Sequence, residues 1–186
     1  VMGGVAAADR RTLGAQTEDK SIALKGESRI PSITGDVGHV NVTSFNRRVL
    51  LTGEVRDEAM KNAVEREVRN IEGVESVANE LIIAGPASYT SRSNDALITT
   101  KVKASLVDMK TISAASFKVV TENATVFLMG RVTQREGTVA ADVARGVGGV
   151  QKVVKLFDYI SEAELKQLQP DPAPARTTST GDTAQQ

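Results

Sequence analysis

The same sequence pattern occurs twice in this chain, and this internal repeat limits the possible folds more than any other feature. The segment 39–55, HVNVTSFNRRVLLTGEV, has a counterpart 77 residues later in the segment 116–132, SFKVVTENATVFLMGRV. With their flanking residues, the two copies span 17–84 and 94–161, which is 68 residues each. A match of this extent indicates duplication of a folding unit. The 186 residues therefore predict two small domains instead of one large one.

Hydrophobic periodicity predicts the first helix and the strand pair of each copy. In the second copy Ile98, Val102 and Leu106 recur every four residues, which is typical of the buried face of a helix. In the first copy, alternating apolar residues predict two strands on either side of Asn46. Asparagine suits a tight turn, so the two strands are expected to form a hairpin.

A second helix and a third strand complete each copy. Apolar residues at helical spacing predict a helix over 57–71, and Thr133 with Glu136 forms a T-x-x-E capping box at the equivalent point of the second copy. Gly73 and Gly149 stand where the C-cap of a helix favours a left-handed residue. The order α-β-β-α-β predicts an α+β fold, with a three-stranded sheet covered by helices in each domain.

Composition assigns the remaining segments. Residues 1–16 begin with a Gly- and Ala-rich stretch and are expected to form a flexible leader. Residues 85–93 are short and polar, as expected of a linker between the domains. Residues 162–186 predict a short helical extension and then a disordered tail, because three of the five prolines fall within 170–174 and few apolar residues follow.

Several classes of function are excluded or disfavoured by the composition. The chain has no Cys and no Trp, and His39 is its single histidine, so disulfides, cysteine-ligated metals and a catalytic cysteine are impossible. No glycine-rich phosphate loop or G-x-S-x-G motif is present. We therefore expect no enzyme, no catalytic residues, no metal site and no cofactor. No run of about 18 apolar residues exists, so no membrane-spanning helix is expected.

Charge separates the two copies. The chain carries 23 Lys and Arg against 23 Asp and Glu, a net charge of zero that argues against general nucleic-acid binding. Residues 17–84 hold nine basic and twelve acidic residues, a net of −3, whereas residues 94–161 hold nine and six, a net of +3. Gly146-Val-Gly-Gly149 fits the G-x-x-G of a KH nucleic-acid loop, but its place between a helix and a strand favours helix capping.

The repeated motif resembles the BON domain (bacterial OsmY and nodulation). That pattern is V-x-L-x-G-x-V at the end of a strand, followed later by G-V-x-x-V. Segments 49–55 and 73–77 satisfy it in the first copy, and segments 126–132 and 149–153 satisfy it in the second.

Two further segments resemble the dual-BON outer-membrane lipoproteins of proteobacteria that are associated with division and outer-membrane stress. These are DRRTLGAQ at 9–16, ahead of the first copy, and NDALITTKVK at 94–103 in the second. The resemblance covers residues 9 to 160. It implies a periplasmic protein held to the inner leaflet of the outer membrane by a lipid, on a cysteine expected upstream of Val1. It also implies support of envelope integrity and cell division.

The resemblance further implies that the first helix of the second domain binds anionic phospholipid. One side of that helix carries an apolar stripe with lysines beside it, which suits insertion at an anionic surface. The candidate site residues are Leu97, Thr100, Lys101, Lys103, Ala104 and Val107. Leu97 stands where the family has a tryptophan, so the interfacial aromatic anchor is missing. The equivalent stripe of the first copy, around Leu24 and Lys25, is much less apolar.

Three alternatives stay open at this stage. Leu97 could pack between the two domains, or it could simply be an exposed residue without a role. The protein could also be an adaptor that contacts envelope proteins through its acidic first domain or its sheet faces. A soluble periplasmic BON protein of the osmotic-stress type is the third alternative.

Overall fold

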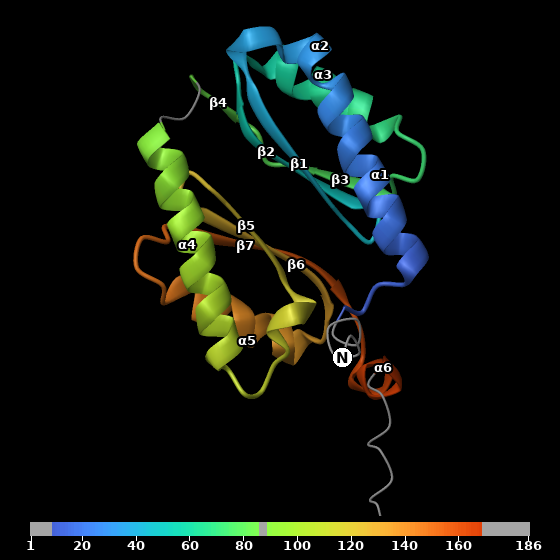
Figure 1. The fold of residues 1–186 in the computed structure, drawn as a ribbon, viewed down its shortest axis with the longest axis vertical. Helices are drawn as coiled ribbons and strands as arrows, with labels where there is room; N and C mark the ends of the chain where they lie inside the picture. Colours follow the sequence, from blue (N-terminus) through green and yellow to red (C-terminus); the bar gives the residue numbers. More distant parts are fainter. Residues whose placement is uncertain (1–8, 86–88, 169–186) are drawn as a thin grey trace, which may run out of the picture.

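A computed structural model of the protein describes residues 9–85 and 89–168. It contains two α+β units whose sheets face each other, with the longer helices on the outer sides (Figure 1). The predicted fold class is confirmed, because two domains of the expected type follow one another along the chain.

The first domain contains one mixed sheet and three helices. Its elements are α1 (Leu13–Arg29), α2 (Pro31–Thr34), the 3-10 turn η1 (Gly35–Val37), β1 (His39–Phe45), β2 (Arg48–Val55), α3 (Glu58–Arg69), β3 (Ser76–Asn79) and β4 (Ile82–Ile83). Strand β1 is antiparallel to β2, while β3 and β4 are both parallel to β2. Leu51 lies opposite Asn79 and Glu54 opposite Ile82. Since β3 and β4 pair with β2 in the same register, they are two parts of one interrupted strand.

The second domain repeats this plan and adds a short helix. Its elements are α4 (Tyr89–Asp108), the 3-10 turn η2 (Ala114–Ser116), β5 (Lys118–Glu122), β6 (Thr125–Val132), α5 (Gln134–Arg145), β7 (Lys152–Tyr159) and α6 (Glu162–Leu168). The sheet order is β5-β6-β7, with β5–β6 antiparallel and β6–β7 parallel. The capping box of Thr133 and Glu136 at the start of α5 is confirmed.

Each hairpin turn has two residues in the left-handed region, and a buried aspartate holds it. The four turn residues with positive φ are Asn46 (49°), Arg47 (64°), Asn123 (48°) and Ala124 (61°). Asp19 of α1 accepts both turn amides of the first hairpin at 2.7 Å. Asp95 of α4 accepts both amides of the second hairpin at 2.8 Å. The first helix of each domain is thereby fixed to its hairpin.

Gly73 and Gly149 adopt the expected left-handed backbone conformation, but in a turn after the helix and not at its C-cap. Gly73 has a φ of 92° and Gly149 a φ of 96°. However, helix α3 has its C-cap at Asn70 and helix α5 at Gly146, so the prediction that the two glycines are C-caps is wrong. Each glycine instead closes a separate turn after the helix, such as the one in which the Val74 amide donates to the Ile71 carbonyl. The third position of such a turn requires positive φ, which glycine adopts without strain.

Three apolar clusters hold the molecule together. One lies inside each domain, between the sheet and its helices. The third joins the domains and is formed by Phe45 and Leu50 from the first sheet and Phe127 and Met129 from the second, each 7% exposed or less. The sheet faces that the helices leave uncovered are therefore buried against each other.

Two segments differ from the composition-based expectations. Helix α1 begins at Leu13, inside the expected leader of residues 1–16, and helix α4 begins at Tyr89, inside the expected linker of residues 85–93. Residues 1–8, 86–88 and 169–186, which contain the rest of the expected leader, the rest of the linker and the expected tail, lie outside the described residues. Helix α6 occupies the start of the segment expected to contain a helical extension.

Candidate functional site

Helix α4 covers the outer side of the second domain, and only its N-terminal part, with Arg92 and Asp95, comes near the first domain, at a pocket shared with His39 (Figure 1). Ile98, Val102 and Leu106 point into the domain core and are at most 1% exposed. The opposite side is open to solvent. All six predicted site residues are exposed, namely Leu97, Thr100, Lys101, Lys103, Ala104 and Val107.

Two of these exposed residues are large aliphatics. Leu97 is 51% exposed and Val107 is 70% exposed. Leu97 does not belong to the cluster that joins the domains, and half of it stays exposed with both domains in place, so it is not buried between them. The structure therefore leaves Leu97 either as part of a contact surface or as an exposed residue without a role.

The two lysines lie on opposite sides of the apolar stripe. Lys101 and Ala104 line an open hollow between α4 and the end of α5, together with Asp108 and Gly146. Lys103 lies on the β5 side, where its charge contributes to lowering the pKa of Lys118. Within the described residues, neither Lys101 nor Lys103 forms an ion pair. Both ammonium groups are therefore available to anionic groups outside the protein.

Other polar groups on the helix limit this surface. The Thr100 hydroxyl donates to the Ala96 carbonyl at 3.1 Å, so its proton is used within the helix. Asp108 is exposed and lines the same hollow as Lys101, which places a negative charge at the C-terminal end of the stripe. Lys101 therefore shares this hollow with an acidic group, whereas Lys103 lies outside it.

The equivalent helix of the first domain exposes fewer apolar residues over the matching positions. Leu24 is 67% exposed on α1, and Lys25 beside it is exposed as well. Leu13 at the start of α1 is 78% exposed. Neither leucine is part of an apolar stripe like that of α4. This agrees with the less apolar stripe that the sequence predicts for the first copy.

The sequence did not assign a role to a second polar region, where the domains meet. Arg11 Nη2 pairs with Asp9 Oδ2 at 2.8 Å and Arg11 Nη1 pairs with Asp19 Oδ2 at 3.0 Å, while the guanidinium carbon lies 4.5 Å from the centre of the Phe45 ring. The hydrogen bond to Asp9 is the largest cause of the raised pKa of Arg11. In the sequence, only the resemblance of segment 9–16 to the dual-BON lipoproteins points to this region.

Arg10, the neighbour of Arg11, reaches the second domain. Its guanidinium forms two hydrogen bonds of 2.8 Å with the Glu136 carboxylate and a third, of 2.9 Å, with the Arg131 carbonyl. Burial by itself raises the pKa of Glu136, but the hydrogen bonds from Arg10 and the Thr133 amide, together with the positive charges of Arg10 and Arg135, lower it overall. The segment before α1 thus ties the two domains together.

Two glutamates meet on the other side of the domain interface. Asn41 donates to Glu122 and Asn123 donates to Glu54, both at 3.0 Å and both across the interface. Burial raises the pKa of Glu122, and the Glu54 carboxylate raises it further. A pair of like charges is therefore enclosed where the domains touch.

Neither metal ligation nor membrane crossing has a structural basis in the part of the chain that is described. No group of three or more His, Asp or Glu side chains there is placed to hold a metal ion. Among the same residues, no helix is both long enough and apolar enough to cross a bilayer.

Comparison with known proteins assigns the family. The BON domain model matches residues 15–85 and again residues 94–161. The chain belongs to the BON family. This confirms the resemblance drawn from the paired V-x-L-x-G-x-V and G-V-x-x-V motifs.

Two relatives resemble this tandem-BON chain along most of its length. The outer membrane lipoprotein DolP of Haemophilus influenzae is 38% identical over 168 residues, which are 86% of each chain. A 21 kDa hemolysin of Actinobacillus pleuropneumoniae is 32% identical over 164 residues, covering 82% of this chain and 79% of the hemolysin. Among solved structures, a chain of CdsD from the Chlamydia trachomatis type III secretion system is similar with a TM-score of 0.33 and 13% identity, covering 76% of this chain and 96% of the solved chain. The relationship to an outer-membrane lipoprotein is consistent with association with the bacterial envelope.

Proposed function

We propose that this BON protein is a non-enzymatic protein of the periplasm that docks on anionic phospholipid through helix α4 of its second domain. The observation that carries the proposal is the solvent-exposed stripe of Leu97, Ala104 and Val107 with Lys101 and Lys103 on its two sides. In this role the protein supports envelope integrity and cell division at the outer membrane.

The geometry of α4 suits a helix that lies in the plane of a membrane surface. Its core side is fixed by Ile98, Val102 and Leu106, so the stripe is presented without unfolding. Aliphatic side chains enter the boundary between headgroups and acyl chains, while lysines on either side contact the headgroups. Leu97, at the N-terminal end of the stripe, takes the place of the missing aromatic anchor.

The expected strength of this contact is modest. Each lysine near an anionic surface contributes about 1 kcal/mol. Complete burial of a leucine or valine side chain contributes about 1.5–3 kcal/mol, and Leu97 starts only half exposed. The sum, about 4–6 kcal/mol, corresponds to reversible binding, and stable anchoring takes a second signal. A lipid attached to a cysteine upstream of Val1 is our proposal for that second signal.

Co-sedimentation with vesicles tests the site. The protein is expected to pellet with phosphatidylglycerol vesicles and to stay in solution with phosphatidylcholine vesicles. Lys101→Glu with Lys103→Glu should reduce pelleting at least tenfold, because four units of charge change on the docking face. Leu97→Ser should weaken it by a smaller factor.

The matched control is Lys25→Glu with Lys166→Glu, two exposed lysines on α1 and α6 that give the same change in net charge. This variant should pellet nearly as well as the parent. Equal loss of binding in the two double variants would show that only the overall charge matters, and the assignment to α4 would then be wrong.

If the protein is an adaptor, fewer surfaces are open to a partner than the sequence suggested. The sheet faces are buried against each other, so they cannot receive a partner unless the domains separate. Helix α1 stays accessible to a partner on the acidic first domain, with Leu24 67% exposed, and so does β4, with Ile83 52% exposed. Leu24→Ser in the intact protein would reduce capture of envelope proteins, without changing vesicle binding, if this second candidate is right.

A further inference from the structure

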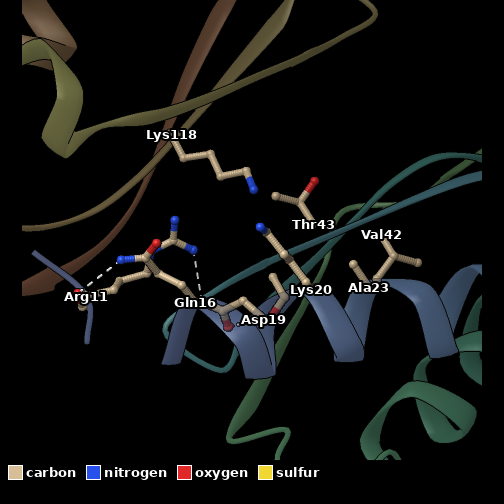
Figure 2. A pocket seen from close by; sticks show the side chains of 9 residues that line it. Arg11, Gln16, Asp19, Lys20, Ala23, Val42, Thr43 and Lys118 are labelled. Atoms are coloured by element: carbon tan, nitrogen blue, oxygen red, sulfur yellow. Dashed lines mark hydrogen bonds and ion pairs between the residues drawn. The ribbon is translucent and has the colours of Figure 1, made fainter. Parts of the chain in front are cut away.

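A small pocket lies at the junction of the two domains, away from the α4 stripe (Figure 2). Helix α1 and strand β1 of the first domain form one side, and Lys118 of strand β5 forms the other. Its volume is about 180 Å³. Pockets for drug-sized ligands are about 300–1,000 Å³. This pocket is therefore suited to an ion or a single headgroup-sized moiety.

Two lysines from different domains extend into the same space. Figure 2 shows the side chains of Lys20 and Lys118 ending close to each other and next to Thr43. Within the described residues, no ion pair or hydrogen bond engages either ammonium group. Two like charges thus converge on a pocket that also presents a hydroxyl group.

The nearby acids are already occupied by other donors. One oxygen of the Asp19 carboxylate accepts from Ser44 Oγ and the Arg47 amide, and the other from the Asn46 amide and Arg11 Nη1. Asp9 is paired with Arg11. These carboxylates therefore leave the two lysines without a direct counter-ion.

The surroundings of Lys118 indicate that it lacks a compensating charge. Burial is the largest cause of the lowered pKa of Lys118, and the positive charges of Arg11 and Lys103 lower it further. Asp19 and Asp9 act in the opposite direction without cancelling this effect. A bound anion would supply the missing negative charge.

We propose that this pocket binds a phosphate-type oxyanion between Lys20 and Lys118, with the Thr43 hydroxyl as an additional donor. Lysine binds phosphate as a point charge, and two lysines on different sides suit an anion with several oxygens. Because Lys20 and Lys118 belong to different domains, binding of the anion would also stabilise the contact between the domains. The anion is either free phosphate or the phosphate of a lipid headgroup, and the site is separate from the proposed α4 surface.

Titration of the intact, ¹⁵N-labelled protein with inorganic phosphate tests the site. Chloride is exchanged for phosphate at constant ionic strength, and the amide signals of Thr43 and Lys118 are followed by NMR. These signals should shift saturably. Lys20→Gln with Lys118→Gln should weaken binding roughly tenfold or more, since both charge-assisted hydrogen bonds to the anion are lost. Lys25→Gln with Lys166→Gln should leave the affinity unchanged.

Further variants keep the result independent of folding. Lys20 is exposed, so Lys20→Gln alone should weaken phosphate binding several-fold without changing the circular dichroism spectrum. Lys118→Arg, which keeps the positive charge, should retain binding. Absence of a saturable shift in the parent protein, or equal weakening by the Lys25 and Lys166 control, would overturn the proposal.

Vesicle binding by the same variants identifies the source of the phosphate. If Lys20→Gln with Lys118→Gln also lowers co-sedimentation with phosphatidylglycerol vesicles, the ligand is a lipid headgroup. If phosphate binding is lost and co-sedimentation is unchanged, the ligand is free phosphate. Failure of the parent protein to bind vesicles at all would refute the α4 proposal and would leave the phosphate titration unaffected.

Discussion

Replacing Arg10 with methionine should destabilise the folded protein strongly, although Arg10 lies outside both repeats. Its side chain is 10% exposed and that of its partner Glu136 is 2% exposed. The substitution removes three hydrogen bonds, two of them to the Glu136 carboxylate. It therefore leaves a buried negative charge without its positive partner.

The structure sets the size of this effect. Loss of one partner from a buried ion pair typically costs about 3–5 kcal/mol. Glu136 still accepts from the Thr133 amide at 3.1 Å, which places the expected loss at the lower end, about 3 kcal/mol. Glu136→Gln keeps this cap and removes the charge. The double variant Arg10→Met with Glu136→Gln should therefore recover about 1–2 kcal/mol relative to Arg10→Met alone.

Urea unfolding followed by circular dichroism at several pH values measures these differences. The lowered pKa of Glu136 means that its contribution is present above the ordinary value of 4.5 and is lost as pH falls through the folded-state value. The deficit of Arg10→Met should accordingly be largest at neutral pH and shrink in acid. Arg69→Met, which breaks an exposed helical pair with Glu65, should cost at most about 0.5 kcal/mol. A loss below about 1 kcal/mol for Arg10→Met would refute the buried tie between the domains.

Three further predictions concern the domain interface and a turn. Glu122→Gln should stabilise the protein at neutral pH, because the pKa of Glu122 is raised in the folded state. The contribution of Glu122 to stability is full below pH 4.5 and is lost as pH rises through the folded-state pKa. The melting temperatures of parent and variant should therefore converge in acid. Phe127→Ala, in the cluster between the sheets, should cost about 3 kcal/mol in urea unfolding, and an unchanged midpoint would exclude that packing in solution. Arg47→Gly should raise stability by about 0.5–1 kcal/mol, because Arg47 has a φ of 64° and Asn-Gly suits such a hairpin, whereas a lower melting temperature would contradict this view of the turn.

The parts of the fold that depend on nearby residues were predictable from sequence. Periodicity at Ile98, Val102 and Leu106 gave both the position of the helix and its buried side. The turn at Asn46 and the capping box at Thr133 are local patterns whose hydrogen bonds form within a few residues. The exposure of the α4 stripe follows from the same periodicity, since the side opposite the core residues faces solvent.

The contact between the domains was missed, because it joins residues that are far apart in the chain. One signal was nevertheless present. Strand β2 contains Val49, Leu50 and Leu51 in succession, and a strand with apolar residues on both faces is expected to be covered on both sides. Leu50 is fully buried and packs between the sheets, whereas Val49 and Leu51 belong to the core of the first domain. The run VFLM in β6 carries the same information.

Helix α1 begins at Leu13, within the leader expected over residues 1–16, and the reason for this difference is another one. Glycine and alanine near the chain start suggested a loose leader, but Thr12 caps α1 by accepting from the Ala15 amide at 3.0 Å. Arg11 pairs with the nearby Asp9 and Asp19, but the carboxylate that Arg10 binds is that of Glu136, 126 residues further along the chain. Amino-acid composition does not indicate these partners, so it could not predict that residues 9–12 adopt a defined conformation.

Pairing of the two sheets decides which surfaces of this BON protein can meet other molecules. The cluster around Leu50 and Phe127 occupies the faces opposite the helices, so contact with a membrane through α4 does not require the domains to separate. The α4 stripe and the interface share no residue, and sites without common partners usually contribute additively. Phe127→Ala should therefore lower stability without lowering vesicle affinity, and Lys101→Glu should do the reverse. Coupling of more than about 0.5 kcal/mol between the two variants in vesicle binding would show that docking depends on domain separation.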